Sequence, residues 1–250
     1  MSFIHLNLHT EYSLVDGLIK IDELAATAEK MNIPAIAVTE KSNVFSAVKF
    51  YRAMHSRGIK PVVGAEINLI TEKKDEFYNI LLLCQHIDGY KNLSKLITKS
   101  YIEGQHLGNP LVHVDWLEKY NEGLIALDCA ENGFLNKSFI NDDASICEKK
   151  IEKWSRIFPR RLYIELQRIG KDNQDVLINN IIVNSNKYNI PLVATNNVRF
   201  LDKLSYEAHE ARVCINQSYT LDDPRRPRLY TSDQYLRTAE EMEILFSDIP

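Results

Sequence analysis

Apolar positions along the chain follow two periods, and segments of the two kinds alternate. Alternating or uninterrupted apolar residues predict β-strands at residues 3–8, 33–40, 60–70, 77–84, 123–129, 161–167 and 190–197. Apolar residues at helical spacing predict helices at residues 21–32, 44–58, 89–104, 147–158, 175–189 and 239–246. Because strands that alternate with helices are usually joined by helical crossovers, we expect most of these strands to be parallel.

The length of 250 residues accommodates one large α/β barrel or two small domains. We favour an α/β fold with a closed barrel over an open sheet, and we assign residues 1–220 to this barrel domain. Residues 221–250 are polar and punctuated by prolines before a final short helix. We therefore expect them to form a C-terminal segment that leads toward a further domain, which would make the chain a fragment of a longer polypeptide.

Composition narrows the class of protein. The chain is 45% hydrophobic and 26% charged, which is typical of a globular protein, and no apolar run reaches the roughly 18 residues that span a bilayer. Four widely separated cysteines and the lack of a signal peptide predict reduced thiols and a cytoplasmic location, with no membrane partner. The net charge of -4 argues against nucleic-acid binding over the whole surface, so any DNA contact would be local.

Polar side chains collect near the ends of the predicted strands. They are Asn7, His9, Glu40, Lys41, Glu66, Asn79, Asp128, Cys129, Asn196, Asn197 and Arg199. In α/β barrels the functional groups gather at the carboxyl ends of the strands, so we expect these side chains to converge on one rim.

Several longer motifs occur in a fixed order along the chain. They are HLNLHTEYSLVDGL, VTEKSNVFSAVKFY, GIKPVVGAEI, GYKNLSKLI, NEGLIAL, LVATNNVRF and AHEARVCINQSYTLDDPRRPRLY. Together they resemble the PHP (polymerase and histidinol phosphatase) domain at the N-terminus of bacterial replicative DNA polymerase III alpha subunits. The resemblance covers essentially the whole chain and implies a distorted (β/α)7-type barrel.

The resemblance also implies a metal pocket that has degenerated. Intact PHP domains hold divalent metals with the motifs H-x-H, D-H-x-N, a lone Glu, a lone His, a Cys or His, and D-x-H. The matching positions here are Asn7 and His9, Glu40 with Lys41, Glu66, Asn79, Cys129, and Asn197 with Arg199. Asparagine is a weak neutral ligand, and lysine and arginine repel a cation. We therefore predict no metal ligands and no catalytic residues, only a vestigial pocket at these nine positions.

Charge balance suggests what replaced the metals. Lys41 and Arg199 can neutralise carboxylates such as Glu40 and Glu66, because a buried carboxylate without a partner destabilises the fold by several kcal/mol. Our hypothesis is that ion pairs and amide hydrogen bonds now hold the former metal site together.

Three classes of function follow from the resemblance. The first is an inactive structural domain of a polymerase that contacts the polymerase core of the same chain and docks the proofreading exonuclease subunit. The second is a metal-dependent phosphoesterase or 3'-5' exonuclease with residual activity. The third, a free-standing histidinol phosphatase, is disfavoured by the TLDDPRRPRLY segment.

We favour the inactive structural domain. We expect no cofactor and no ordered Zn²⁺ or Mn²⁺ in it. DNA would be reached through the parent polymerase, a DNA-directed nucleotidyltransferase that uses Mg²⁺.

Other conspicuous residues have simpler interpretations. His5 is predicted to be a hydrogen-bonded strand residue and His209 a packing or capping residue on a helix. The arginines at positions 212, 225, 226 and 228 are interpreted as a solvated or salt-bridged loop in preference to a nucleic-acid contact.

Overall fold

The computed structural model describes residues 2–71, 76–172 and 174–249. Its core is a mixed sheet in the order β1-β2-β3-β7-β8-β9, with β6 paired to β2. The strands are β1 (Ala35–Lys41), β2 (Lys60–Ile70), β3 (Phe77–Cys84), β6 (Val112–His113), β7 (Leu124–Asp128), β8 (Leu162–Gln167) and β9 (Leu192–Thr195), with a separate hairpin of β4 (Gln105–His106) and β5 (Asn109–Pro110). The helices are α1 (Ile21–Lys30), α2 (Ala47–His55), α3 (Ile87–Ile102), α4 (Val114–Tyr120), α5 (Phe134–Asn141), α6 (Ala144–Ile157), α7 (Gln174–Tyr188), α8 (Tyr206–Gln217) and α9 (Ala239–Leu245).

Most neighbouring strands of the sheet are parallel, as expected, but β3 is an exception. β1 and β2 are parallel, as are β7, β8 and β9, but β3 is antiparallel to both β2 and β7. The connection between β2 and β3 is only residues 71–76, which is too short for a helical crossover, so the chain must turn back on itself. This reversal places the start of β3, rather than its end, at the rim.

The predicted strand at residues 3–8 is not a regular strand, yet it closes the curl of the sheet. The Ala37 N–H donates to the His5 carbonyl at 2.9 Å, and the His9 N–H donates to the Val198 carbonyl at 2.9 Å. The Val198 N–H in turn donates to the Asn7 carbonyl at 3.0 Å. The N-terminal segment therefore lies between β1 and the chain that follows β9, and this brings Asn7 and His9 to the rim.

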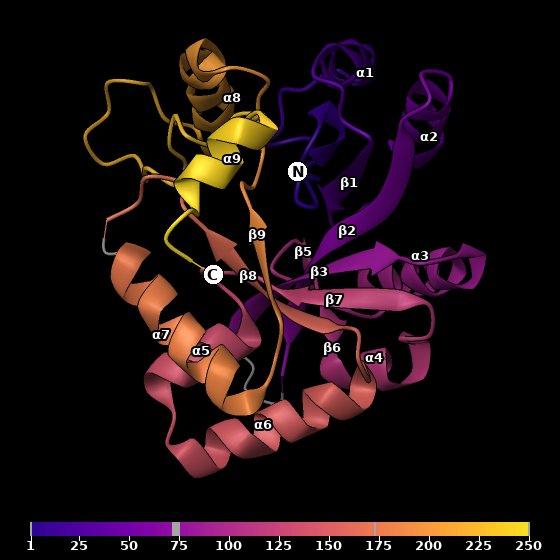
Figure 1. The fold of residues 1–250 in the computed structure, drawn as a ribbon, viewed down its shortest axis with the longest axis vertical. Helices are drawn as coiled ribbons and strands as arrows, with labels where there is room; N and C mark the ends of the chain where they lie inside the picture. Colours follow the sequence, from indigo (N-terminus) through magenta and orange to yellow (C-terminus); the bar gives the residue numbers. More distant parts are fainter. Residues whose placement is uncertain (1, 72–75, 173, 250) are drawn as a thin grey trace.

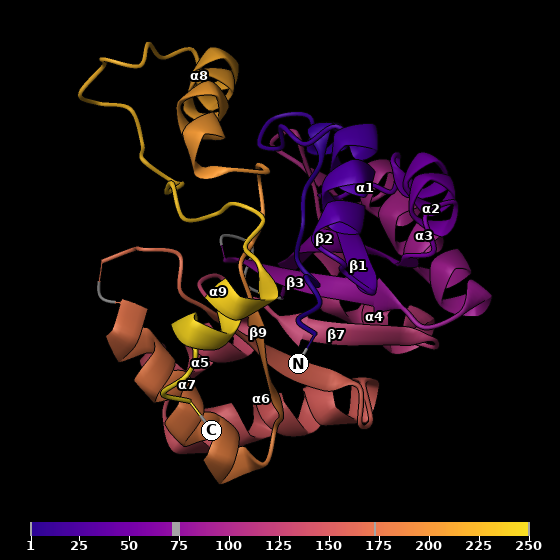
Figure 2. The same ribbon diagram turned by 45° about the horizontal axis from the view of Figure 1, so that its top comes forward.

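Helices cover both flanks of the sheet (Figures 1 and 2). One apolar core lies between the sheet and helices α3 to α7, a second lies beneath α1 and α2, and a third fills the inside of the curl. Residues 35–40 of β1 are all buried, which confirms the strand predicted from an uninterrupted apolar run. Within the described ranges, the helices are too short or too polar to span a bilayer.

The C-terminal segment packs against the barrel. The Leu236 N–H donates to the Phe200 carbonyl at 3.0 Å, and Leu236 and Met242 are buried. Helix α9 begins with a capping box formed by Thr238 and Glu241. Helix α8 and the loop that follows it project from the rest of the molecule (Figure 2). The short helices α4 and α5 were not predicted, because their apolar patterns span only about two turns.

Candidate functional site: a charged pocket at the rim of the barrel

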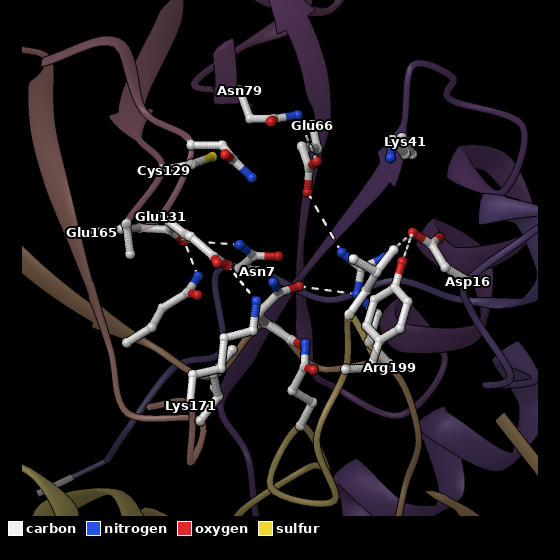
Figure 3. A pocket seen from close by; sticks show the side chains of 18 residues that line it. Asn7, Asp16, Lys41, Glu66, Asn79, Cys129, Glu131, Glu165, Lys171 and Arg199 are labelled. Carbon is white, nitrogen blue, oxygen red and sulfur yellow. Dashed lines mark hydrogen bonds and ion pairs between the residues drawn. The ribbon is translucent and has the colours of Figure 1, made fainter. Parts of the chain in front are cut away.

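A cavity of about 220 Å³ opens at the rim of the curled sheet (Figure 3). Seven of the nine predicted pocket residues line it: Asn7, Lys41, Glu66, Asn79, Cys129, Asn197 and Arg199. The other two, His9 and Glu40, are fully buried, and His9 bonds to Asn7 in the wall of the cavity. Asn79 reaches the rim because β3 is antiparallel, which pairs it with Asn68 near the end of β2.

Arg199 is the central cation of the pocket. Its guanidinium is almost fully buried, and its Nη1 lies 2.9 Å from Asp16 Oδ2 while its Nη2 lies 3.7 Å from Glu66 Oε2. Its Nε donates to Asn197 Oδ1 at 3.0 Å. One positive side chain thus faces two carboxylates that come from different parts of the chain.

These carboxylates are held in their charged form. Burial by itself raises the pKa of a carboxyl group, but His9, by hydrogen bond and charge, together with Arg199 lowers the pKa of Glu66 to about 2. The same balance applies to Asp16, where Arg199 overcomes burial and holds the pKa well below its usual range. Asp16 was not predicted as a pocket residue, although it belongs to the quoted SLVDGL motif.

Glu40 is satisfied by neutral donors. It accepts hydrogen bonds from the Thr10 N–H at 3.1 Å, from the Thr10 hydroxyl, and from Ser13 Oγ at 2.6 Å. The hypothesis of ion pairing therefore agrees with the contacts of Glu66 and Arg199, whereas Glu40 is held by hydroxyl and backbone groups.

Asn7 connects the two sides of the pocket. Its amide nitrogen donates to Glu165 Oε1 at 2.9 Å, and its amide oxygen lies 3.1 Å from His9 Nε2. Glu165 also accepts from Thr195 Oγ1 at 2.9 Å and from Gln167 Nε2 at 3.2 Å. The amide at position 7 is well suited to this place because it donates to one neighbour and accepts from another.

Glu165 was missed by the sequence analysis, although a carboxylate within the apolar strand predicted at residues 161–167 is itself a signal. It is completely buried, and burial raises its pKa to about 7 despite the hydrogen bonds from Asn7 and Thr195. This carboxyl group therefore takes up a proton far more readily than an exposed glutamate.

Cys129 and Asp128 are both buried at the end of β7. Burial, together with the charge of Glu165, raises the pKa of the Cys129 thiol well above its usual value, whereas the thiolate is the form that binds metals. Asp128 accepts hydrogen bonds from the backbone N–H groups of Leu135 and Asn136 at the start of α5. Its function is to cap that helix.

The donor set does not fit a divalent metal cluster. Among the described residues, no three His, Cys, Asp or Glu side chains are grouped so that they could hold an ion. Two carboxylates that line the pocket, Asp16 and Glu66, already face the Arg199 cation. An internal network of ion pairs and amide hydrogen bonds holds these side chains together.

The remaining predicted positions have internal partners. The His5 Nε2 donates to the Arg237 carbonyl at 2.9 Å, and His209 is buried and donates to the Asp16 carbonyl at 3.0 Å. Three of the four arginines at positions 212, 225, 226 and 228 have partners within the chain. Arg225 forms an ion pair with Asp223, Arg226 forms one with Glu210, and Arg212 donates to the Leu14 carbonyl. These contacts agree with a salt-bridged loop.

Comparison with known proteins gives a consistent picture. The PHP domain family matches residues 5–169. The chain is 43% identical over 251 residues to the DNA polymerase III subunit alpha of Pseudomonas aeruginosa and 39% identical over 249 residues to that of Escherichia coli K12. These alignments cover 100% and 99% of this chain but only 21% and 22% of the relatives, so the chain spans about a fifth of their length.

Solved structures support the fold. A protein from Bifidobacterium adolescentis, assigned as a metal-dependent phosphoesterase, superimposes with a TM-score of 0.51 at 10% identity, covering 78% of this chain and 86% of that one. An amidohydrolase from Chromobacterium violaceum, with bound sulfate and no metal, gives a TM-score of 0.52 at 12% identity over 84% and 96% of the two chains. At such identities the likeness concerns the barrel alone. The family match covers well over half of the chain and includes strands β1 to β8, and the chain therefore belongs to the PHP domain family.

Proposed function

We propose that this chain is the PHP domain of a DNA polymerase III alpha subunit and that it acts as a structural scaffold without phosphoesterase activity of its own. In this proposal the polymerase core continues the same polypeptide, and the proofreading exonuclease subunit docks on the domain. Nucleotidyl transfer, with its Mg²⁺ ions and its DNA, belongs to the rest of the polymerase.

The observation that carries the proposal is the position of Arg199. Its guanidinium pairs with Asp16 and Glu66, two carboxylates that would otherwise be free to bind a metal ion. An arginine neutralises the carboxylates but cannot activate water as a nucleophile, because it does not coordinate hydroxide. The similarity to polymerase alpha subunits over the whole chain supports the polymerase setting.

Metal content and hydrolysis test the proposed inactivity. The purified chain is incubated with Zn²⁺ or Mn²⁺, desalted, and analysed for bound ions, and its hydrolysis of bis(p-nitrophenyl) phosphate is followed. We expect less than one ion per chain and a rate equal to that of buffer. Two or more ions per chain that are lost in Glu66→Gln, together with hydrolysis, would contradict the proposal and favour a residual phosphoesterase.

Co-purification tests the proposed docking. The chain is co-expressed with the proofreading exonuclease subunit encoded by the same genome, and the mixture is separated by gel filtration. We expect the two polypeptides to elute together. Separate elution of two folded proteins would contradict exonuclease docking while leaving the metal result unaffected.

A further inference from the structure

Helix α2 carries an exposed face that takes no part in the pocket. Phe50 and Met54 on its inner side are fully buried and anchor it to the core. Its outer side exposes Val48 at 62% and Tyr51 at 51%, and Phe45, just before the helix, is 64% exposed. The Tyr51 ring on α2 and the Phe45 ring just before it are thus exposed beside a helix that the core anchors.

The same stretch is strongly basic although the chain as a whole is acidic. Residues 41–65 contain five lysines and arginines and no aspartate or glutamate, against a net charge of -4 for the whole chain. Lys49, Arg52 and His55 alternate with the exposed apolar residues on the outer face of α2. The rings of Tyr51 and His55 are stacked, with their centroids 5.9 Å apart.

Lys49 and Arg52 are weakly neutralised, whereas Arg57 pairs with Glu29 at 3.3 Å. Lys49 Nζ lies 3.9 Å from Asp22, whose side chain is 78% exposed, so that contact is loose. Arg52 has no ion pair with any side chain in the described part of the chain. A ligand that brings negative charge would therefore gain a guanidinium that is not already engaged.

We propose that the outer face of α2, formed by Phe45, Val48, Lys49, Tyr51, Arg52 and His55, binds single-stranded nucleic acid. Flat rings and cations in alternation match a strand in which each unstacked base is followed by a phosphate. A duplex keeps its bases stacked and would leave Phe45 and Tyr51 without a partner. This inference goes beyond the proposed scaffold function and does not depend on the pocket.

Fluorescence anisotropy of a labelled oligothymidylate of about 16 nucleotides tests the inference on the 250-residue chain. We expect binding at about 50 mM NaCl that weakens as the salt concentration rises. Tyr51→Ala should weaken binding about tenfold because a stacking partner is lost. Arg52→Glu should weaken it at least as much and reduce the slope of log K against log salt by about 0.7 or more.

Two variants on other helices serve as matched controls. Tyr101→Ala removes an aromatic ring of α3 that is 46% exposed, and Arg156→Glu makes the same charge change on the exposed side of α6. Both should bind the oligonucleotide like the unmodified chain, and circular dichroism verifies that every variant is folded.

Three results would overturn the inference. One is the absence of binding at low salt. Another is equal weakening in the control variants, which would indicate non-specific attraction. The third is competition by polyglutamate as effective as by unlabelled oligothymidylate, which would point to an acidic protein segment as the partner.

Discussion

Arg199 illustrates how one residue sets the charge balance of a buried pocket. A buried guanidinium is stable only if its charge is matched, and here Asp16 and Glu66 supply the match from two distant segments. The reverse also holds, since without the arginine Asp16 would lose its ion-pair partner and Glu66 would keep only its contact with His9 at 3.3 Å. The side chain therefore stabilises the pocket through charge compensation.

We expect Arg199→Ala to lower the free energy of unfolding by about 3–5 kcal/mol, because it removes the ion-pair partner of the buried Asp16 and one of the cations beside Glu66. Urea denaturation followed by circular dichroism measures the change. Asp16→Asn in the Arg199→Ala background should recover part of the loss. An unchanged melting temperature for Arg199→Ala would show that the ion pairs do not hold the pocket together.

Leu14 adopts a strained backbone conformation beside the pocket. Its φ is 61° and its ψ is -56°, and the Val15 N–H donates to the Ser13 carbonyl at 2.7 Å across it. This is the geometry of a tight γ-turn that a leucine adopts only at a cost. Its side chain is 61% exposed, so packing offers little compensation.

We expect Leu14→Gly to raise the free energy of unfolding by about 1 kcal/mol, because glycine enters this region without strain. Thermal denaturation would detect the change. Leu204→Gly is the control, since Leu204 is 92% exposed and lies outside the positive-φ set. Leu204→Gly should lower the free energy of unfolding by about 0.5–1 kcal/mol. A similar decrease for Leu14→Gly would refute the argument from strain.

At the scale of elements, periodicity identified nearly all the long strands and helices but not how they pair. The apolar runs of β1 and β2 were recognisable because their residues are buried, and burial leaves a pattern in the sequence. Strand direction leaves no such pattern. The antiparallel direction of β3 results from the short connection at residues 71–76. The irregular segment at residues 3–8, which closes the curl of the sheet, was visible in the sequence only as an approximate alternation of apolar residues.

Helix α9 provides a test at this scale because it is short and depends on its cap. The Thr238 hydroxyl accepts from the Glu241 N–H at 3.1 Å, and the Glu241 carboxylate accepts from the Thr238 N–H at 2.7 Å. We expect Thr238→Ala to lower the free energy of unfolding by about 1 kcal/mol. Glu240→Ala, in the same turn but outside the capping box, should lower the free energy of unfolding by only a few tenths of a kcal/mol. Chemical denaturation measures both changes.

At the scale of the whole molecule, buried carboxyl groups should shape the dependence of stability on pH. Burial raises the pKa of Glu165 and of Asp128 to about 7, while that of Glu66 is lowered to about 2. A raised pKa means that the folded chain holds a proton the unfolded chain has already released, so stability falls as pH rises through 7. The lowered pKa of Glu66 stabilises the fold above about pH 4.5, and that contribution is lost as pH falls toward 2.

We therefore expect Glu165→Gln to reduce the loss of stability between pH 5.5 and pH 8.5 by about 1–3 kcal/mol, because glutamine resembles the protonated acid. Denaturation at a series of pH values measures this. Glu131→Gln is the control, since Glu131 is exposed and pairs with Lys171 at the mouth of the pocket. If Glu165→Gln and the unmodified chain follow parallel curves, Glu165 does not titrate in this range.

The sequence by itself determined the alternation of strands and helices, the resemblance to PHP domains, and the side chains that gather at the rim. These features can be read from residues that are close in the sequence, because buried positions recur with the period of each strand or helix. Only the tertiary structure decided that Asp16 and Glu66 share Arg199 and that Asn7 links Glu165 to His9. Such partners are separated by up to 183 positions, as Asp16 and Arg199 are, and their contact depends on how the whole sheet curls and closes.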